Sequence, residues 1–206
     1  MSARKNPLQK VVAESDFTRA PHRVRIIGGK WKRSHLPVPA LAGLRPTPDR
    51  VRETLFNWIE HLVPDLDAVR GLDLFAGTGA LGFELASRGA RQVRLVESNR
   101  QLIDQLTQVK RKLAADQVDI VAADALSVAA RWPAASFEII FVDPPFDSAL
   151  LIPALAASAR LVTADGLIYV ESGAPIEANL TENRFQVERS GRAGRVFFCL
   201  LRPASA

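Results

Sequence analysis

A tetrapeptide, Asp143-Pro144-Pro145-Phe146, follows an apolar run at 137–142 and has the residue types needed to hold an aromatic amine. The lone pair of such an amine is delocalised into its ring, which makes the nitrogen a poor nucleophile. The Asp143 carboxylate and the Pro144 carbonyl can accept the two N–H hydrogens and turn the lone pair towards a methyl group. The second proline helps to fix the backbone that aims this carbonyl, and Phe146 can stack on a base. All four residues are therefore candidate catalytic residues.

A glycine-rich turn at 72–82, Leu-Asp-Leu-Phe-Ala-Gly-Thr-Gly-Ala-Leu-Gly, has the pattern of a strand that runs through a turn into a helix. Glycines let the backbone approach a ligand, and the start of a helix offers unpaired N–H groups. Glu97 follows the next strand, beside Ser98, and can accept hydrogen bonds from both ribose hydroxyls of a nucleoside. The segment therefore predicts a cofactor site that includes Phe75, Ala76, Gly77, Thr78, Gly79, Glu97 and Ser98.

Two cofactors fit this pattern, because the same glycine spacing and acid also satisfy the dinucleotide fingerprint of NAD enzymes. Asp73, just before the turn, favours S-adenosylmethionine: its carboxylate can receive the ammonium of the methionine moiety but would repel a pyrophosphate. Asp124, followed by Ala125 after the third strand, can accept from the adenine amine. Each aspartate also has a structural alternative, since Asp73 could brace the loop and Asp124 could cap a helix.

Repeated strand and helix patterns from residue 71 onward predict an α/β domain with a parallel sheet and helices on both faces. We expect strands near 71–75, 92–96, 118–122, 137–142 and 166–171, with helices between them. Near the end of the chain, 184–188 and 196–201 flank a short polar segment that leaves no room for a helix. These two strands predict a hairpin, and a mainly parallel sheet of seven strands with one antiparallel strand.

The N-terminal part is strongly basic: residues 1–52 contain twelve Lys or Arg and three Asp or Glu, in a chain of net charge +5. Residues 1–21 lack apolar periodicity and are expected to be a disordered basic tail. An alternating segment at 23–27 and Gly28-Gly29 predict a β-hairpin extension at 22–43 with basic side chains on one face. Such an extension on a catalytic domain at 44–206 is typical of polyanion binding.

A helix is predicted after Leu44, with Thr47 as its N-cap, Pro48 at its first position and Asp49 favourable to its dipole. Helical spacing predicts that it buries Val51, Leu55, Trp58, Ile59 and Leu62 and ends at Pro64.

Composition limits the other classes of function. The chain has 206 residues, one cysteine and three scattered histidines, so an internal disulfide is excluded and no metal site is predicted. Cys199 lies in an apolar run and is expected to pack in the core. No apolar stretch is long enough to span a membrane, and the first residues do not resemble a signal peptide, so we expect a cytoplasmic protein.

The motifs together resemble the bacterial small-subunit ribosomal RNA guanine-N2 methyltransferases of the class I, Rossmann-like type. The resemblance covers roughly residues 22 to 201. Its most specific parts are the segments 25–31, 44–58, 72–82, 87–90 and 141–146. After Trp31 the family usually continues with a basic residue, a glycine and a basic residue, whereas here the chain reads Lys32-Arg33-Ser34.

The resemblance implies a substrate, a cofactor and a set of RNA contacts. The substrate would be a guanine N2 amine of 16S rRNA in an assembled or nearly assembled 30S subunit, and S-adenosylmethionine would leave as S-adenosylhomocysteine. Arg45, Thr47 and the residues up to Arg52 would close over the methionine end of the cofactor. We expect a monomer that grips RNA through Arg23, Arg25, Lys30, Trp31, Lys32, Arg33 and Arg50.

Three other interpretations remain open from the sequence. An NAD-dependent oxidoreductase would share the glycine loop, although no hydride-transfer residues follow it. A non-catalytic ribosome assembly factor would keep the fold only to bind RNA. The tetrapeptide also occurs in adenine-N6 enzymes, but a DNA adenine methyltransferase usually has a separate target-reading domain for which this chain has no room.

Overall fold

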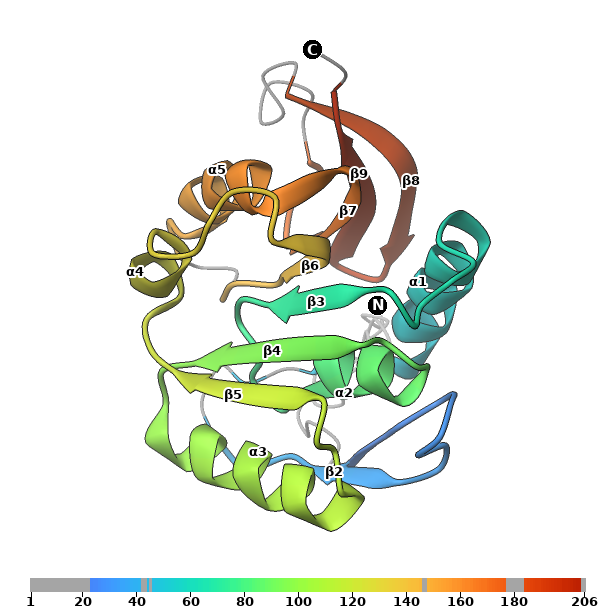
Figure 1. Cartoon of the computed structure of the whole chain (residues 1–206), viewed down its shortest axis with the longest axis vertical. Coiled ribbons are helices and arrows are strands. Elements are labelled where there is room, and N and C mark those ends of the chain that lie inside the picture. The colour runs from blue at the N-terminus through green and yellow to red at the C-terminus, as the bar shows by residue number, and fades with distance from the viewer. Residues whose placement is uncertain (1–22, 42–43, 45, 146–147, 177–183, 205–206) are drawn as a thin grey trace, which may run out of the picture.

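A seven-stranded sheet forms the centre of the computed structural model, with strand order β5-β4-β3-β6-β7-β9-β8 (Figure 1). The structure describes residues 23–41, 44, 46–145, 148–176 and 184–204. The predicted tail at 1–21 therefore lies outside the described residues. Strands β3 to β7 pair in parallel, and β9 is antiparallel to both β7 and β8, so β9 is the one antiparallel strand of the sheet.

The strand positions follow the sequence prediction closely in the first half of the sheet: β3 is Arg70–Asp73, β4 Gln92–Glu97, β5 Val118–Ala122 and β6 Phe137–Val142. β7 is longer than predicted, spanning Val162–Ser172, and it pairs with β6 through an irregularity between Phe137 and Ile139. The final hairpin, β8 Phe185–Ala193 and β9 Val196–Pro203, is confirmed, with longer strands that join at Gly194 and Arg195.

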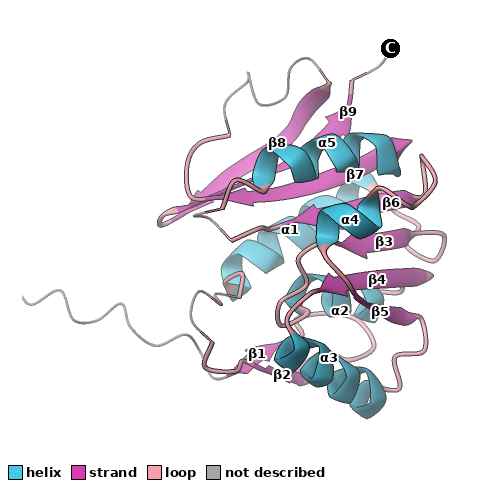
Figure 2. Cartoon of the chain, turned by 90° about the vertical axis from the view of Figure 1, so that its left-hand side faces the viewer, coloured by secondary structure: helices cyan, strands magenta, loops and turns pink. Residues whose placement is uncertain are grey.

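Helices cover both faces of the sheet. One face carries α1 (Asp49–Leu62), α2 (Ala80–Ser87) and α3 (Arg100–Leu113), which share a core cluster. The other face carries α4 (Ala125–Ala129) and α5 (Leu151–Leu161), which pack in a second cluster together with Cys199. In Figure 2, α4 and α5 lie in front of the strands, and α1 and α2 lie behind them. The arrangement brings the carboxyl ends of the parallel strands to one edge of the sheet, where ligands bind in open α/β folds.

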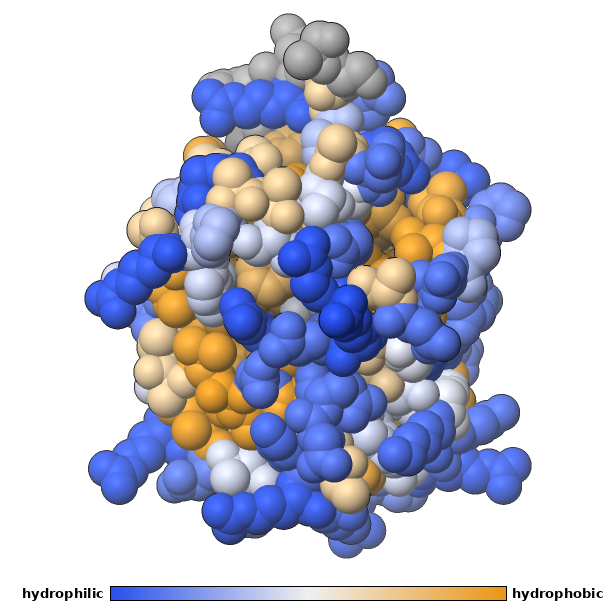
Figure 3. Space-filling view, in the orientation of Figure 1, coloured by the Kyte–Doolittle hydropathy of each residue, from blue (hydrophilic) through white to orange (hydrophobic). Residues whose placement is uncertain are grey.

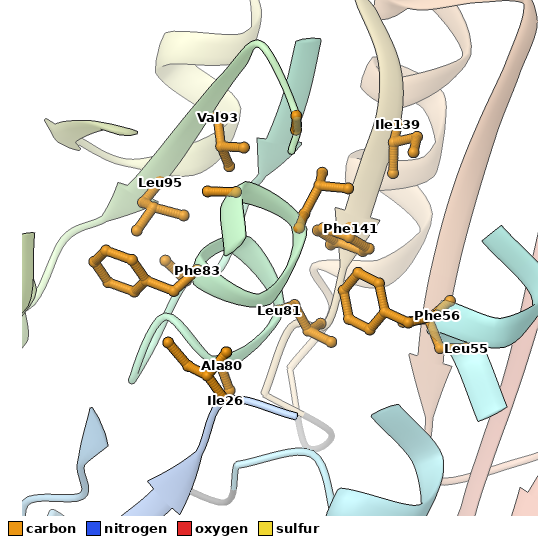
Figure 4. Packing of buried hydrophobic residues seen from close by; sticks show 14 of the residues in the cluster. Ile26, Leu55, Phe56, Ala80, Leu81, Phe83, Val93, Leu95, Ile139 and Phe141 are labelled. Carbon is orange, nitrogen blue, oxygen red and sulfur yellow. The ribbon is translucent and has the colours of Figure 1, made fainter. Parts of the chain in front are cut away.

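The predicted N-terminal hairpin is present as β1 (Arg23–Arg25) and β2 (His35–Pro37), with Val24 opposite Leu36. Residues 28–33 form the turn and do not belong to the second strand. Apolar side chains of the extension join the core of the domain: Ile26 and Leu36 are fully buried. Figure 4 shows Ile26 beside Ala80 and Leu81, near Phe56 and Phe141. The extension is therefore packed against the domain and is not a free arm.

Helix α1 begins at Asp49 with Pro48 as its N-cap residue, and no side chain caps it. The prediction of Thr47 as N-cap was therefore wrong, because the Thr47 hydroxyl is used elsewhere, as described below. Val51, Leu55 and Ile59 are buried as predicted, while Trp58 and Leu62 are only partly buried. Arg52, which we predicted as part of a cofactor-closing basic segment, is one of the largest fully buried side chains.

The described surface is mostly polar. In the orientation of Figure 1, hydrophilic side chains cover most of the visible face, with hydrophobic side chains gathered in smaller patches (Figure 3). None of the helices in the described part of the chain has the length and apolar character required to cross a bilayer.

Candidate active site

Five acidic residues from five different elements lie at or near the carboxyl-terminal edge of the sheet. They are Asp73 at the end of β3, Glu97 at the end of β4, Asp124 after β5, Asp143 after β6 and Glu171 next to the end of β7. Four of them were predicted, and Glu171 was not. A dense group of carboxylates at the ligand-binding edge of such a sheet is suited to a ligand that carries positive charge and hydrogen-bond donors.

Asp73 is the most deeply buried of the predicted cofactor residues, at 1% exposed. Its Oδ2 accepts a hydrogen bond from the Gly82 N–H at 3.1 Å, whereas Oδ1 has no partner among the described residues. Burial raises the pKa of Asp73 to about 7, against the opposing hydrogen bonds from Gly82 and Phe75. An unpaired oxygen on a buried carboxylate is costly in a folded protein unless a ligand completes it.

The glycine turn depends on backbone geometry that other residues would not allow. Gly77 has a φ of 53°, in the left-handed region, and its N–H donates to Glu97 Oε2 at 2.9 Å. A Cβ on Gly82 would lie 2.0 Å from the Leu95 side chain, so only glycine lets α2 approach β4 closely enough to reach Asp73. Of the remaining loop residues, Ala76, Thr78 and Gly79 are buried, and Phe75 is half-buried.

Glu97 is partly exposed, and both of its carboxylate oxygens already accept backbone hydrogen bonds. Oε2 accepts from Gly77, and Oε1 accepts from Ser98 and Asn99, each at 2.8 Å. These bonds tie the end of β4 to the glycine turn and fix the carboxylate. Oε1 already accepts two hydrogen bonds, but Oε2 accepts only one, so the fixed carboxylate can still receive a hydroxyl donor at Oε2.

Asp124 is exposed and caps α4: its Oδ1 accepts from the Ser127 N–H at 2.8 Å. Hydrogen bonds from Ser127 lower the pKa of Asp124, which keeps it ionised. The capping alternative recognised in the sequence is therefore real, and it leaves Oδ2 available to a donor. Ala125, the first residue of α4, is buried beneath it.

Asp143 directly follows β6, with Pro144 buried and Pro145 exposed. Phe146 lies outside the described residues. Burial, the charge of Glu171 and then the charge of Asp73 raise the pKa of Asp143 well above its usual range. The register places Asp73 opposite Phe141, two residues before Asp143, so the tetrapeptide and the glycine turn converge as the sequence predicted.

Glu171 is 3% exposed and is the main site residue that the sequence analysis missed. Its Oε1 accepts from the Thr47 hydroxyl at 2.6 Å and from the Tyr169 hydroxyl at 2.9 Å. Thr47 therefore braces the segment before α1 against the sheet and does not cap the helix. The only available signal was a charged residue at the end of an otherwise apolar strand at 166–171. Arg45, predicted to act in this segment, lies outside the described residues.

The predicted RNA contacts lie on the extension and on the first turn of α1. Arg23, Lys30, Lys32, Arg33 and Arg50 are exposed, and none of them forms an ion pair within the part of the chain that the structure describes. Arg25 is exposed and pairs with Asp49 at 2.9 Å. These basic side chains lie where a polyanion can reach them.

Trp31 behaves differently from the other predicted RNA contacts. The residue is 7% exposed and its ring belongs to the main core cluster, and its backbone N–H donates to the Ser87 hydroxyl of α2 at 2.9 Å. The bulky aromatic ring closes the gap between the hairpin turn and α2. In this structure Trp31 therefore anchors the hairpin and is not positioned to stack on a base.

Among the described residues, no group of three or more His, Cys, Asp or Glu side chains could hold a metal ion. S-adenosylmethionine fits better: the unpaired Asp73 oxygen suits an ammonium, and the fixed Glu97 carboxylate suits ribose hydroxyls.

The sheet topology, with acidic residues along the carboxyl ends of its parallel strands, is that of a class I methyltransferase. Solved structures agree: a putative methyltransferase, yhhF, from Escherichia coli has a TM-score of 0.74 and 39% identity, covering 89% of this chain and 99% of that one. A putative methylase from Haemophilus influenzae has a TM-score of 0.72 and 31% identity, with 89% and 99% covered.

The family follows from sequence comparison. Residues 24–202 match the model of the family described as conserved hypothetical protein 95, and the chain belongs to this family. It is 40% identical over 181 residues to the ribosomal RNA small subunit methyltransferase D of Escherichia coli K12, covering 86% of this chain and 89% of that protein. The protein of that name from Haemophilus influenzae is 38% identical over 160 residues, with 74% and 80% covered.

Proposed function

We propose that this protein methylates the exocyclic N2 amine of a guanine in 16S ribosomal RNA of the small subunit, in the cytoplasm, with S-adenosylmethionine as donor. The observation that carries the proposal is the buried carboxylate of Asp73, which lies beside Asp143 and Pro144. One of its oxygens, Oδ1, has no hydrogen-bond partner among the described residues. The relatives named as small-subunit rRNA methyltransferases support the RNA substrate, and the resemblance noted in the sequence supports guanine.

The cofactor supplies an electrophilic methyl group on a sulfonium when it is bound. Asp73 would receive the ammonium, Glu97 the ribose hydroxyls, and Asp124 the adenine amine through Oδ2. The backbone of 75–79, together with Ser98 and Ala125, would line the site, and Arg45 and Thr47 would border its methionine end. The carboxylate at Asp73 disfavours the pyrophosphate of NAD at this position, because the two groups repel each other.

The tetrapeptide would hold the reacting amine. Asp143 and the Pro144 carbonyl accept its two N–H hydrogens, Pro145 restricts the backbone, and Phe146 stacks on the base. The basic extension, through Arg23, Arg25, Lys30, Lys32 and Arg33, binds RNA phosphates together with Arg50 of α1. The target base must leave its stack to reach the site, so an unpaired or flipped guanine is expected.

The test is transfer of labelled methyl groups to purified small subunits from cells that lack the gene, followed by mass spectrometry of the modified nucleoside. We expect N2-methylguanosine with the wild-type protein and loss of at least about a hundredfold in rate with Asp143→Ala, while S-adenosylmethionine still raises the melting temperature. NAD is the control ligand and should not raise it. Full activity of Asp143→Ala, or modification of another atom, would contradict the proposal.

A further inference from the structure

Asp143 and Glu171 occupy equivalent places on neighbouring strands. β6 and β7 pair in parallel with Val142 opposite Val170, so Asp143 and Glu171 are the next residues along each strand. Side chains alternate along a strand, which puts both carboxylates on the face that carries Phe141 and Tyr169. The rings of Phe141 and Tyr169 meet edge to face at 6.2 Å beneath them.

Hydrogen bonds from two hydroxyl groups hold the Glu171 carboxylate in one position. The hydroxyls of Thr47 and Tyr169 both donate to Oε1, from the segment before α1 and from β7 itself. The other charged or titratable groups around the pair are Asp73 of β3, Arg52 of α1 and Cys199 of β9. Burial raises the pKa of Glu171, while the hydrogen bonds from Thr47 and Tyr169 and the charge of Arg52 oppose this rise. Arg52 makes no ion pair with Glu171 among the described residues.

We propose that Glu171 is a positioning residue for methyl transfer, whose buried negative charge makes the neighbouring Asp143 carboxylate able to accept the proton that the amine releases. This inference rests on the proposed function. As the N–CH₃ bond forms and the S–CH₃ bond breaks, sulfur keeps the electron pair and the nitrogen loses one proton, which Asp143 takes up. Like charges in a shared, dry site favour proton binding, so a fixed Glu171 carboxylate raises the proton affinity of Asp143.

The same reasoning explains why a carboxylate is buried at this point. Hydrogen bonding from Thr47 and Tyr169 could be met equally by a glutamine, whose amide oxygen also accepts. A glutamine would brace the segment before α1 but would leave Asp143 with a lower proton affinity. The charge of Glu171, and not only its shape, is therefore the property to test.

The first experiment compares Glu171→Gln, which keeps the shape, with Glu171→Asp, which keeps the charge, in single-turnover methyl transfer across pH. We expect Glu171→Gln to lower the rate about tenfold or more at pH 8 and to move the acid-side midpoint down by about one pH unit. Glu171→Asp should keep a midpoint close to that of the wild type, and Asp104→Asn, an exposed change on α3, should do the same. An unmoved midpoint in Glu171→Gln would overturn the proposal, as would an equal shift in Asp104→Asn.

Cofactor affinity separates this role from the proposed function itself. Glu171→Gln should bind S-adenosylmethionine within about threefold of wild type, because Asp73 holds the ammonium. Loss of binding equal to that of Asp73→Asn would place Glu171 in the cofactor site and overturn the positioning role. If the wild-type protein transfers no methyl group at all, the proposed function fails first, whatever the variants do.

A second measurement does not require any Glu171 variant to fold. Tyr169 is the only tyrosine in the chain, and its hydroxyl donates to Glu171. Tyrosine labelled with ¹³C at Cζ therefore gives one NMR signal that reports ionisation of Glu171. In the cofactor-free protein we expect Asp143→Asn to lower its titration midpoint by about one pH unit, because the neighbouring charge is gone. Asp104→Asn, an exposed change on α3, is the control, and a midpoint equal in all three proteins would overturn the proposal.

Discussion

Two groups of charged side chains, most of them buried, lie on the same side of the sheet and differ in whether their charges are paired. In the first, Arg52 and Glu84 are both fully buried, and Arg88 pairs with Glu84 at 2.8 Å. In the second, Asp73, Asp143 and Glu171 are gathered without an ion pair to any Lys or Arg in the described part of the chain. Charges that are compensated within the protein contribute to holding its parts together, whereas a group of uncompensated charges is a candidate for binding a ligand.

The compensated group fastens the extension to the domain. Glu84 accepts from the backbone N–H groups of Ile27 and Gly28 at 2.7 and 2.8 Å, and Arg52 donates to the Arg25 carbonyl at 2.9 Å. Every one of these contacts joins the hairpin to α1 or α2. The basic surface of the hairpin is thus held in a fixed orientation relative to the carboxylate edge.

The largest expected effect comes from breaking the compensated group. Glu84→Ala leaves Arg52 buried with one fewer partner and two backbone donors unpaired, so it should lower the free energy of unfolding by about 3–5 kcal/mol. Denaturant unfolding at pH 7.5 measures this change. Glu53→Ala, on the exposed side of α1, is the control and should cost less than about 1 kcal/mol. A small effect of Glu84→Ala would contradict the structural role.

The second prediction concerns a substitution that should raise the free energy of unfolding. Because the pKa of Asp73 is about 7 in the folded protein and its usual value is near 4, the folded state holds a proton that the unfolded state has lost at intermediate pH. Stability from this proton is present at low pH and is lost as pH rises through 7. Asp73→Asn escapes that loss, so above pH 7 the cofactor-free variant should be more stable than wild type by about 2–4 kcal/mol.

The test measures the free energy of unfolding of wild type and Asp73→Asn between pH 4 and 8. Asp116→Asn, between α3 and β5, is the control. The difference between Asp73→Asn and wild type should grow across the range and level off above pH 7. A variant that is less stable than wild type at pH 8 would show that Asp73 is compensated after all.

Sequence patterns predicted which segments meet at the carboxyl edge of the sheet, because the determinants of these segments are local. The glycine spacing, the acid after β4 and the Asp-Pro-Pro run each follow an apolar strand, and parallel strands bring such segments together without further information. What could not be predicted depends on contacts between distant residues. Thr47 and Glu171 are separated by 124 positions, and nothing near Thr47 distinguishes a hydroxyl that caps a helix from one that reaches across to a strand.

The sequence also did not predict which polar and aromatic residues of the extension and of α1 are buried. Arg52 lies in a basic segment and has the sequence signature of a surface residue, but its partner Glu84 lies on α2. Trp31 lies between two lysines in the sequence, and only its packing against α2 shows that its ring is enclosed. A hairpin that packs on a helix mixes core and surface residues at intervals that strand alternation alone does not reveal.

A third prediction concerns the surface that the compensated group orients. Lys30→Glu with Lys32→Glu should weaken binding to small subunits about tenfold at moderate salt and make binding less dependent on salt, because two phosphate contacts are lost. Binding of S-adenosylmethionine should not change. Arg111→Glu with Lys112→Glu, in the last turn of α3, is the matched control. Equal weakening by both pairs would indicate a general charge effect and no defined RNA surface.

The smallest effect is expected at Arg33, which has a φ of 71°. This is the position at which the resembling family usually has glycine, and the left-handed backbone explains that preference. Arg33→Gly should raise the free energy of unfolding by about 1 kcal/mol and cost one phosphate contact. Lys32→Gly, at a neighbouring turn position, is the control and should not stabilise the protein. A destabilised Arg33→Gly would contradict the strain at this turn.

The most direct test of the uncompensated group compares two nucleosides that differ only in the amino-acid moiety, S-adenosylhomocysteine and 5′-methylthioadenosine, by titration calorimetry at pH 8. The account predicts that wild type binds the first about 30-fold or more tightly than the second, and that Asp73→Asn loses most of this preference. Equal affinities in the wild-type protein, or a preference that survives Asp73→Asn, would contradict it.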